Sequence, residues 1–201
     1  MAKIKLTKNE LKKQKDQLKM FQRYLPTLML KKQQLQAEIR TVEQKIKGLS
    51  EEKIKLDEEF KTWIAVFGEK GVFTPDLLRI TKIVAGDGNI AGVPIPVFES
   101  VDFEMANYDF LSKPLWLDTA IEKLKKKLSV DMEVRTLEEQ QRRLSKELRT
   151  TSQRVNLFEK IKIPESRSNI KKIQVYLGDQ QTAAVVRGKI SKRGMEKAVS
   201  A

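Results

Sequence analysis

The side chains that could carry out chemistry in this chain are carboxylates and hydroxyls, because the sequence contains no cysteine and no histidine. Thiol and imidazole catalysis, disulfide bridges and Cys/His zinc sites are therefore excluded. The acidic residues and hydroxyls form no recognisable constellation with a base or a phosphate-binding loop. The sequence thus predicts a protein that is not an enzyme and that holds no cofactor and no metal.

One glycine cluster, Gly86-x-Gly88-x-x-x-Gly92, suggests a nucleotide-binding loop. Its spacing differs from the dinucleotide fingerprint, no helix is expected after it, and no Gly-Lys-Ser/Thr is present. Residues 80–84 and 93–103 on either side are rich in β-branched and aromatic types. We therefore predict a β-hairpin whose two strands flank Gly86-Asp87-Gly88-Asn89, with the glycines serving the turn.

Residues 7–67 have the pattern of one long helix. Thr7 and Glu10 have the spacing of a capping box. From Leu11 onward, 14 of the 17 heptad a and d positions are apolar, whereas the 40% apolar composition would give about 7 by chance. This stripe predicts a packing seam, in which the polar exceptions set register or partner choice. The exceptions are Gln14, Lys32 and Lys53, and Pro26 predicts a kink.

A second long helix is predicted to start at Ser112-Lys113-Pro114, since serine caps helices and proline is tolerated in the first turn. Its apolar stripe slips in register after Leu128 and again at Pro164, which predicts an irregular supercoil. Gly188 and Gly194 suggest that the last dozen residues fray.

Two such helices can bury their stripes by folding back on each other. The predicted fold is mainly α, a long antiparallel two-helix coiled coil with a small β-hairpin insert between the helices. The expected segments are an N-terminal helix over 1–67, a hairpin insert over 68–113, and a C-terminal helix with a basic tail over 114–201. This folding would place Thr7 near Leu177, and Pro26 and Pro164 near one level.

The net charge of +13 is concentrated at the two ends of the chain. Residues 1–35 carry 10 basic and 2 acidic side chains, and residues 153–201 carry 11 and 4, so the remainder is slightly acidic. Antiparallel folding would bring both basic ends to one pole. A charge segregated in this way predicts that the two poles meet different partners.

No apolar run approaches the roughly 20 residues that a membrane-spanning helix needs, and the basic N-terminus lacks the apolar core of a signal peptide. We therefore expect a soluble cytoplasmic protein without direct membrane insertion.

Three sets of residues resemble a known family, the D subunit of V-type and A-type rotary ATPases. The first is Leu6-Thr7-Lys8 with Leu11 and Leu18. The second is Asn89-Ile90-Ala91-Gly92-Val93 with Ile95-Pro96-Val97-Phe98-Glu99. The third and most specific is Arg154-Val155-Asn156-Leu157-Phe158-Glu159, followed by Ile163-Pro164, and Lys189-Ile190-Ser191-Lys192 is similar to the basic tail of the family.

The resemblance implies the central rotor shaft of an ion-translocating ATPase or ATP synthase, peripheral to the membrane and without catalysis of its own. The basic pole would enter the bore of the head formed by the A and B subunits. The far end would sit on the socket subunit of the membrane rotor, and the small F subunit would bind near the β insert. Basic side chains near that pole are expected to contact acidic surfaces of the head. These are Lys12, Lys13, Lys15, Lys19, Arg187, Lys189, Lys192 and Arg193.

Two alternatives remain open on the residues alone. A prefoldin-like chaperone also places hairpin strands between two coiled-coil helices, although the strongly basic ends fit poorly with apolar tips that hold unfolded clients. A nucleic-acid-binding coiled coil would be compatible with the pI near 9.8. The chain nevertheless has no zipper basic region, helix-turn-helix or set of stacking aromatics, so no nucleic-acid partner is expected.

Overall fold

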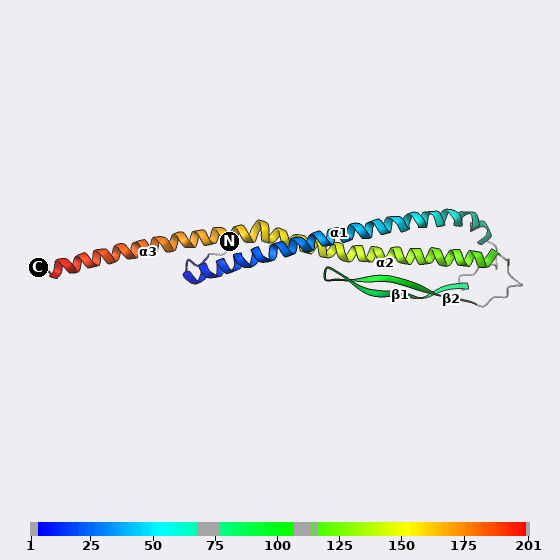
Figure 1. Cartoon of the computed structure of the whole chain (residues 1–201), viewed down its shortest axis with the longest axis horizontal. Helices are drawn as coiled ribbons and strands as arrows, with labels where there is room; N and C mark the ends of the chain where they lie inside the picture. Colours follow the sequence, from blue (N-terminus) through cyan, green and yellow to red (C-terminus); the bar gives the residue numbers. More distant parts are fainter. Residues whose placement is uncertain (1–3, 68–76, 107–113, 115, 200–201) are drawn as a thin grey trace. The chain divides into compact units, whose positions relative to one another are not determined.

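The computed structural model describes residues 4–67, 77–106, 114 and 116–199, and Figure 1 shows the order of the elements. The side chains of residues 62–67 and 196–199, including Trp63 and Phe67, lie outside the described residues, as does the expected helix start at Ser112-Lys113. The elements are α1 (Lys8–Phe67), β1 (Leu78–Ile90), β2 (Val93–Met105), α2 (Trp116–Asn156), the π-helical turn η2 (Leu157–Lys162) and α3 (Ile163–Val199). The predicted mainly α fold with a hairpin between the helices is confirmed.

The chain divides into two units, which are described separately below. Unit 1 comprises residues 1–30 and 151–201, and unit 2 comprises residues 31–150. Each unit contains part of α1 and part of the C-terminal helical segment. Among the described helices, none combines the length and the apolar character that crossing a membrane requires.

In unit 2, ion pairs between α1 and α2 establish the antiparallel arrangement. Successive α1 residues pair with α2 residues of falling number, as an antiparallel pair requires: Lys31 Nζ with Glu147 Oε1 at 2.6 Å, Lys53 Nζ with Asp131 Oδ1 at 2.8 Å, and Glu59 Oε2 with Lys123 Nζ at 2.9 Å. The polar seam residue Lys53 thus has a specific partner on the other helix. The main core joins both helices to the hairpin tip through Leu35, Ile39, Val42, Val93, Ile95, Leu137 and Leu144.

The first register slip in α2 marks a change of partner. Leu117 and Ile121 pack with Leu78 at the base of the hairpin, with Leu124 and Leu128 beside them. Beyond the slip, Val130 and Val134 pack instead with Leu56 of α1. The slip therefore separates a stretch packed on the base of the hairpin from one packed on α1, and further along Leu137 and Leu144 contact both α1 and the hairpin tip.

Where the stripe of α2 faces the hairpin, charged side chains connect α2 to α1. Lys126 lies 3.0 Å from Glu52, and Lys127 forms an ion pair with Asp57 while its ammonium lies 5.2 Å from the centroid of the Phe60 ring. The hydrogen bond from Lys127 lowers the pKa of the Asp57 carboxyl. We call these pairs, together with Lys53–Asp131 and Glu59–Lys123, the charged belt.

The two central residues of the hairpin turn lie four residues further along the chain than those of the predicted turn. β1 and β2 pair from Leu78↔Met105 to Ile90↔Val93, so Gly86-Asp87-Gly88-Asn89 lies inside β1 and the prediction that it separates the strands is wrong. The turn is Ala91-Gly92, whose φ angles of 52° and 79° fit a two-residue turn of the I′ kind. The Asn89 side chain accepts a hydrogen bond from the Gly92 N–H at 2.9 Å.

The glycines within β1 make room for side chains of β2. A Cβ atom at Gly88 would lie 2.7 Å from Val97 Cγ2, and one at Gly86 would meet the carboxylate of Glu99. Because these glycines lack a Cβ atom, side chains of β2 can pack over them and β1 continues through this stretch. This explains why a glycine-rich stretch is not the turn.

Side chains of α2 hold the β2 edge of the hairpin. Gln140 donates from Nε2 to the Pro96 carbonyl at 2.6 Å, and Arg143 donates to the Pro94 carbonyl at 3.2 Å. Hydrogen bonds from Arg142 and then Arg143 lower the pKa of Glu139 to about 2, so this carboxylate stays charged and orients Arg143. Because proline has no backbone N–H, Pro94 and Pro96 leave no unpaired donor on this edge of the hairpin.

In unit 1, the start of α1 packs against η2 and the first half of α3. The Glu10 N–H donates to the Thr7 hydroxyl at 3.3 Å, which confirms Thr7 as the cap. Asn169 donates from Nδ2 to Gln14 Oε1 at 3.4 Å, so the polar seam residue Gln14 again has a partner across the helix pair. Pro26 lies inside α1, which is helical on both sides of it.

The two helix prolines lie on opposite sides of the contact between Phe21 and Phe158. Because Gln14 pairs with Asn169, Pro164 lies opposite about residue 19 of α1, roughly 10 Å along the helix pair from Pro26 at 1.5 Å per residue. This register is close to the predicted one, which placed Thr7 near Leu177.

Candidate partner-binding surface

The net charge of the protein resides in unit 1. By sequence, unit 1 contains 19 basic and 6 acidic side chains, whereas unit 2 contains 21 of each. Both basic segments of the chain belong to unit 1. A surface of this charge attracts acidic partners over several ångströms and accelerates their association.

The candidate residues of α1 lie in its first turns, away from the seam. Lys12, Lys13, Lys15 and Lys19 are all exposed, while their neighbours Leu11 and Leu18 are half-buried. The heptad pattern accounts for this difference, since only a and d positions face the other helix. A surface groove of about 430 Å³ lies beside them. It is lined by Asn9, Lys12, Lys13, Asp16, Gln17 and Met20.

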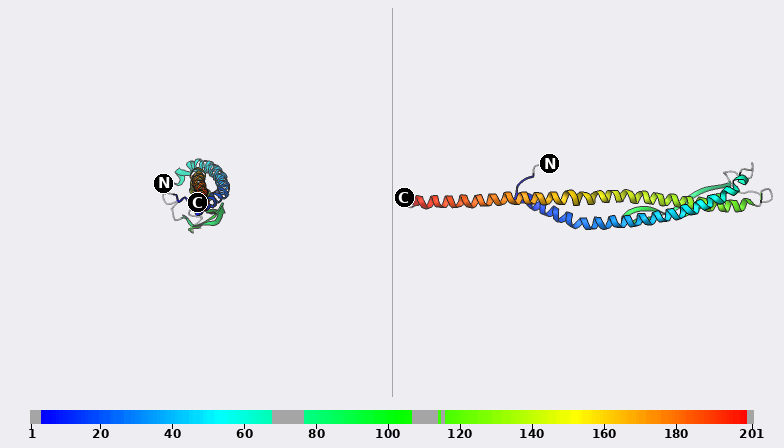
Figure 2. Two further views of the ribbon diagram at one scale, coloured as in Figure 1. Left: turned by 90° about the vertical axis from the view of Figure 1, so that its left-hand side faces the viewer. Right: turned by 90° about the horizontal axis from the view of Figure 1, so that it is seen from above.

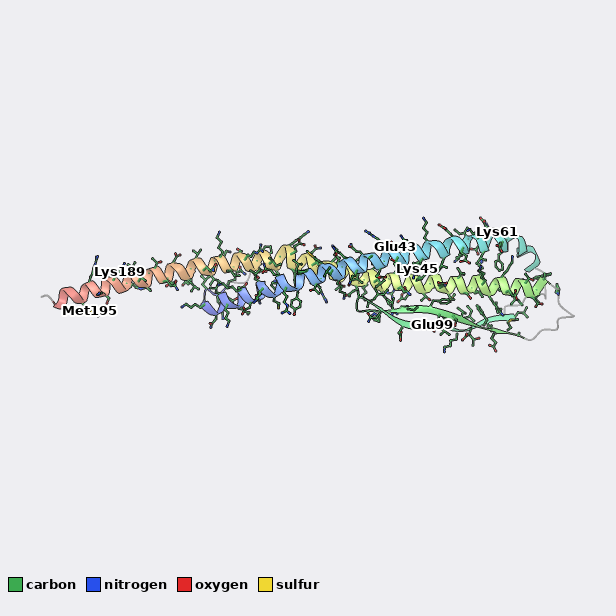
Figure 3. The ribbon with its side chains drawn as sticks, viewed as in Figure 1. Glu43, Lys45, Lys61, Glu99, Lys189 and Met195 are labelled. Atoms are coloured by element: carbon green, nitrogen blue, oxygen red, sulfur yellow. The ribbon has the colours of Figure 1, made fainter. Side chains whose placement is uncertain are left out.

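The candidate residues of α3 lie near its end. Arg187, Lys189, Lys192 and Arg193 are exposed, and α3 remains helical to Val199 rather than fraying over its last dozen residues as expected. Figures 1 and 2 show this part of α3 extending beyond the first residues of α1. Lys189 and Met195 project from it in Figure 3.

The two candidate sets share one unit but form two separate groups. Because Gln14 pairs with Asn169, Lys12 lies opposite about residue 171 of α3. Arg187 follows roughly 24 Å further along the helix at 1.5 Å per residue. The basic residues of α1 therefore lie beside a helix pair, whereas those of α3 lie on a single helix.

Apolar side chains on the same surface were missed at the sequence level. Along the single-helix part of α3, Val185, Val186, Ile190 and Met195 are 49–68% exposed, and Leu157 and Ile161 of η2 are 40% and 54% exposed. The sequence could have indicated that these side chains are exposed, because they fall outside the apolar stripe formed by Ile163, Ile170, Ile173 and Leu177. Ala184 continues the seven-residue spacing of Ile163, Ile170 and Leu177 in the sequence, but it is exposed.

The composition of this surface is suited to binding a protein partner. Basic side chains interspersed with apolar ones match the composition of protein interfaces, in which an apolar centre is surrounded by charge. Among the described residues, no group of three acidic side chains is placed to hold a metal ion. The arrangement therefore fits a protein partner with acidic and apolar patches.

Comparison with known proteins extends over almost the whole chain. The model of the family described as the D subunit of ATP synthase matches residues 10–193. A protein from Borreliella burgdorferi, named as the D subunit of a V-type ATP synthase, is 54% identical over 98% of this chain and 97% of its own length. Proteins of the same name from Chlamydia pneumoniae and Chlamydia felis are each 34% identical, over 96% and 97% of this chain and 93% and 95% of their own lengths.

Proposed function

The chain belongs to the D-subunit family of ATP synthases, and on that premise we propose that it is the central rotor subunit of a V-type rotary ATPase. In this role it couples ATP hydrolysis or synthesis in the catalytic head to ion translocation across the membrane. It carries out no catalysis itself. It transmits rotation between the nucleotide sites and the membrane rotor.

The observation that carries this proposal is the distribution of charge. The unit that holds both chain ends contains the whole net charge of +13, and the other unit is neutral. Such a difference allows one unit to associate with an acidic bore while the other meets different partners. The proposed head contacts are the α1 group (Lys12, Lys13, Lys15 and Lys19) and the α3 group (Arg187, Lys189, Lys192 and Arg193).

The helix pair of unit 2 has features that a torque-transmitting element needs. Ion pairs at several levels, from Lys31–Glu147 to Glu59–Lys123, link α1 to α2 and oppose sliding of one helix along the other. The hairpin, fixed to α2 through Gln140, makes this unit asymmetric. An asymmetric element can favour a different state at each nucleotide site as it turns.

The remaining partners of the proposal are the small F subunit and the socket subunit of the membrane rotor. F is assigned to the region of the hairpin, and the socket protein to the neutral unit 2. The protein would then be cytoplasmic and peripheral to the membrane, held there through the complex.

Charge reversal in the assembled head tests the proposal. Replacing Lys12, Lys13, Lys15 and Lys19 with Glu is expected to weaken association with the A and B subunits and to reduce the coupled ATPase rate. Association should also weaken steeply with added salt. A matched control reverses four exposed lysines of unit 2, namely Lys45, Lys47, Lys55 and Lys61. If both variants bind the head as the unchanged protein does, the assignment of unit 1 as the head-binding unit is wrong.

A further inference from the structure

The C-terminal helical segment contains one extra residue in its packing stripe. Up to Phe158 the seam-facing residues recur in steps of three and four, as in Leu144, Leu148, Thr151 and Val155. The next seam residue after Phe158 is Ile163, a step of five. The π-helical turn η2 spans this step, and the Ile163 N–H bonds to the carbonyl of Phe158, five residues earlier.

The extra residue determines which side chains of α3 face α1. With a regular step of four after Phe158, the stripe would run through Lys162, Glu165 and Lys172. With the step of five it contains Ile163 and Ile173, which are 8% and 0% exposed. Removing one residue from η2 would restore the regular step and would leave these isoleucines on the seam. A chain one residue shorter could therefore pack the same seam without a π-helical turn.

Pro164 does not by itself account for the turn either. A proline within a helix removes a hydrogen bond and crowds the preceding turn. Pro26 has the same effect in α1, yet α1 is α-helical from Lys8 to Phe67. Single π-helical turns are uncommon in helices and occur frequently at functional sites.

What the turn does present is an apolar pair on the outer surface. None of the residues of η2 is buried, and Leu157 and Ile161 lie one turn apart with 40% and 54% of their surface exposed. Lys160 is adjacent to Ile161 in sequence and Arg154 lies three residues before Leu157, and both are exposed, as is Glu159 between the pair. This arrangement is an apolar pair with two basic side chains and one acidic side chain near it, in a unit of high positive charge.

We propose that η2 is a docking element that presents Leu157 and Ile161 to an acidic-rimmed apolar surface of the catalytic head. The inference rests on the proposed function and adds a contact that charge alone does not provide. Charge complementarity favours such a surface as the partner, because basic residues flanking an apolar pair match an acidic rim around an apolar centre. A few well-buried anchor residues carry most of the affinity of a protein interface.

Two variants in the full chain test the proposal without disturbing the seam. Deletion of Glu159 shortens the step from Phe158 to Ile163 from five residues to four, so it changes how Leu157 and Ile161 are presented. The deletion adds no negative charge and increases the net positive charge. Ile161→Ser removes one exposed apolar anchor, and Ile54→Ser, at a site in unit 2 with 58% exposure, is its matched control. Each variant is assembled with the A and B subunits, and its dissociation constant and thermal midpoint are measured.

The expected result is association about tenfold weaker for the deletion and for Ile161→Ser, with a thermal midpoint equal to or above that of the unchanged protein. Ile54→Ser should bind normally. A photo-crosslinking residue at position 161 should attach to a head subunit.

Three outcomes would count against the proposal, in different ways. If the deletion and Ile161→Ser bind normally while charge reversal of the α1 group weakens binding, the docking role of η2 is overturned and the proposed function stands. If charge reversal has no effect either, the proposed function also fails. A crosslink from position 161 to the F or socket subunit would overturn the choice of the head as partner.

Discussion

Phe21 of α1 and Phe158 of η2 pack ring against ring, with centroids 5.0 Å apart and planes inclined by 43°. Phe21 is a predicted d position, and Phe158 is the last stripe residue before the five-residue step. The contact therefore fixes the register of unit 1 at the point where the helix geometry changes. A tilted, offset arrangement is favourable for aromatic rings because the edge of one meets the face of the other.

A double-mutant cycle can measure this contact. Phe21→Leu and Phe158→Leu should each destabilise the protein, and their coupling free energy should be about 0.5–1.5 kcal/mol in urea unfolding. Strict additivity would show that the two rings do not stabilise each other.

The hairpin turn offers a stabilising substitution. Ala91 adopts φ 52°, a region that costs an alanine roughly 1 kcal/mol and that asparagine tolerates better. Ala91→Asn should raise the thermal midpoint, whereas Gly92→Val should lower it because Gly92 has φ 79°. If Gly92→Val is as stable as the unchanged protein, the assigned turn is incorrect.

Gln140 should be important for docking of the hairpin. It is 7% exposed, and Gln140→Ala would leave the Pro96 carbonyl without its donor at a cost of about 1–2 kcal/mol. Urea unfolding measures the loss, and hydrogen exchange should rise in β2. Gln141→Ala is the control, because the bond from Gln141 to Glu43 is exposed. Equal effects at the two positions would contradict a special role for Gln140.

The charged belt should make stability depend on pH in the acid range. Because Lys127 lowers the pKa of Asp57 below its ordinary value of 3.8, the ion pair stabilises the fold above that value. This contribution is lost as the pH falls through the folded-state pKa. The thermal midpoint of the unchanged protein should therefore fall more steeply between about pH 5 and pH 2 than that of Asp57→Asn. Glu58→Gln, at an exposed position, should follow the unchanged protein, and parallel curves for all three would exclude the effect.

Much of the helix pair could be predicted from residue types along the chain. Every apolar a and d position of α1 whose side chain is described is buried or half-buried, from Leu11 to Phe60. Thr7 was identified as the cap from its spacing to Glu10. These features depend on periodicity within one helix, which is a local property. The basic candidate residues of α1 and α3 are exposed, and their head contacts remain a proposal.

Other features depend on residues that are far apart in the sequence. The turn was misplaced because glycine is a poor strand former in isolation, and only Val97 and Glu99 across the hairpin make Gly86 and Gly88 suitable for β1. Likewise, the register slip after Leu128 was visible in the sequence, but the packing partners on its two sides could be identified only from the positions of Leu78 and Leu56.

The sequence by itself determined that two long helices with apolar stripes flank a hairpin, because the heptad spacing specifies which side of each helix avoids water. Tertiary structure decided the partner of each stretch of stripe and the placement of the step from Phe158 to Ile163 in a π-helical turn. The physical reason is that a one-residue insertion can be absorbed anywhere nearby along an isolated helix. Packing against α1 confines it to the turn where Ile163 and Ile173 still reach the seam.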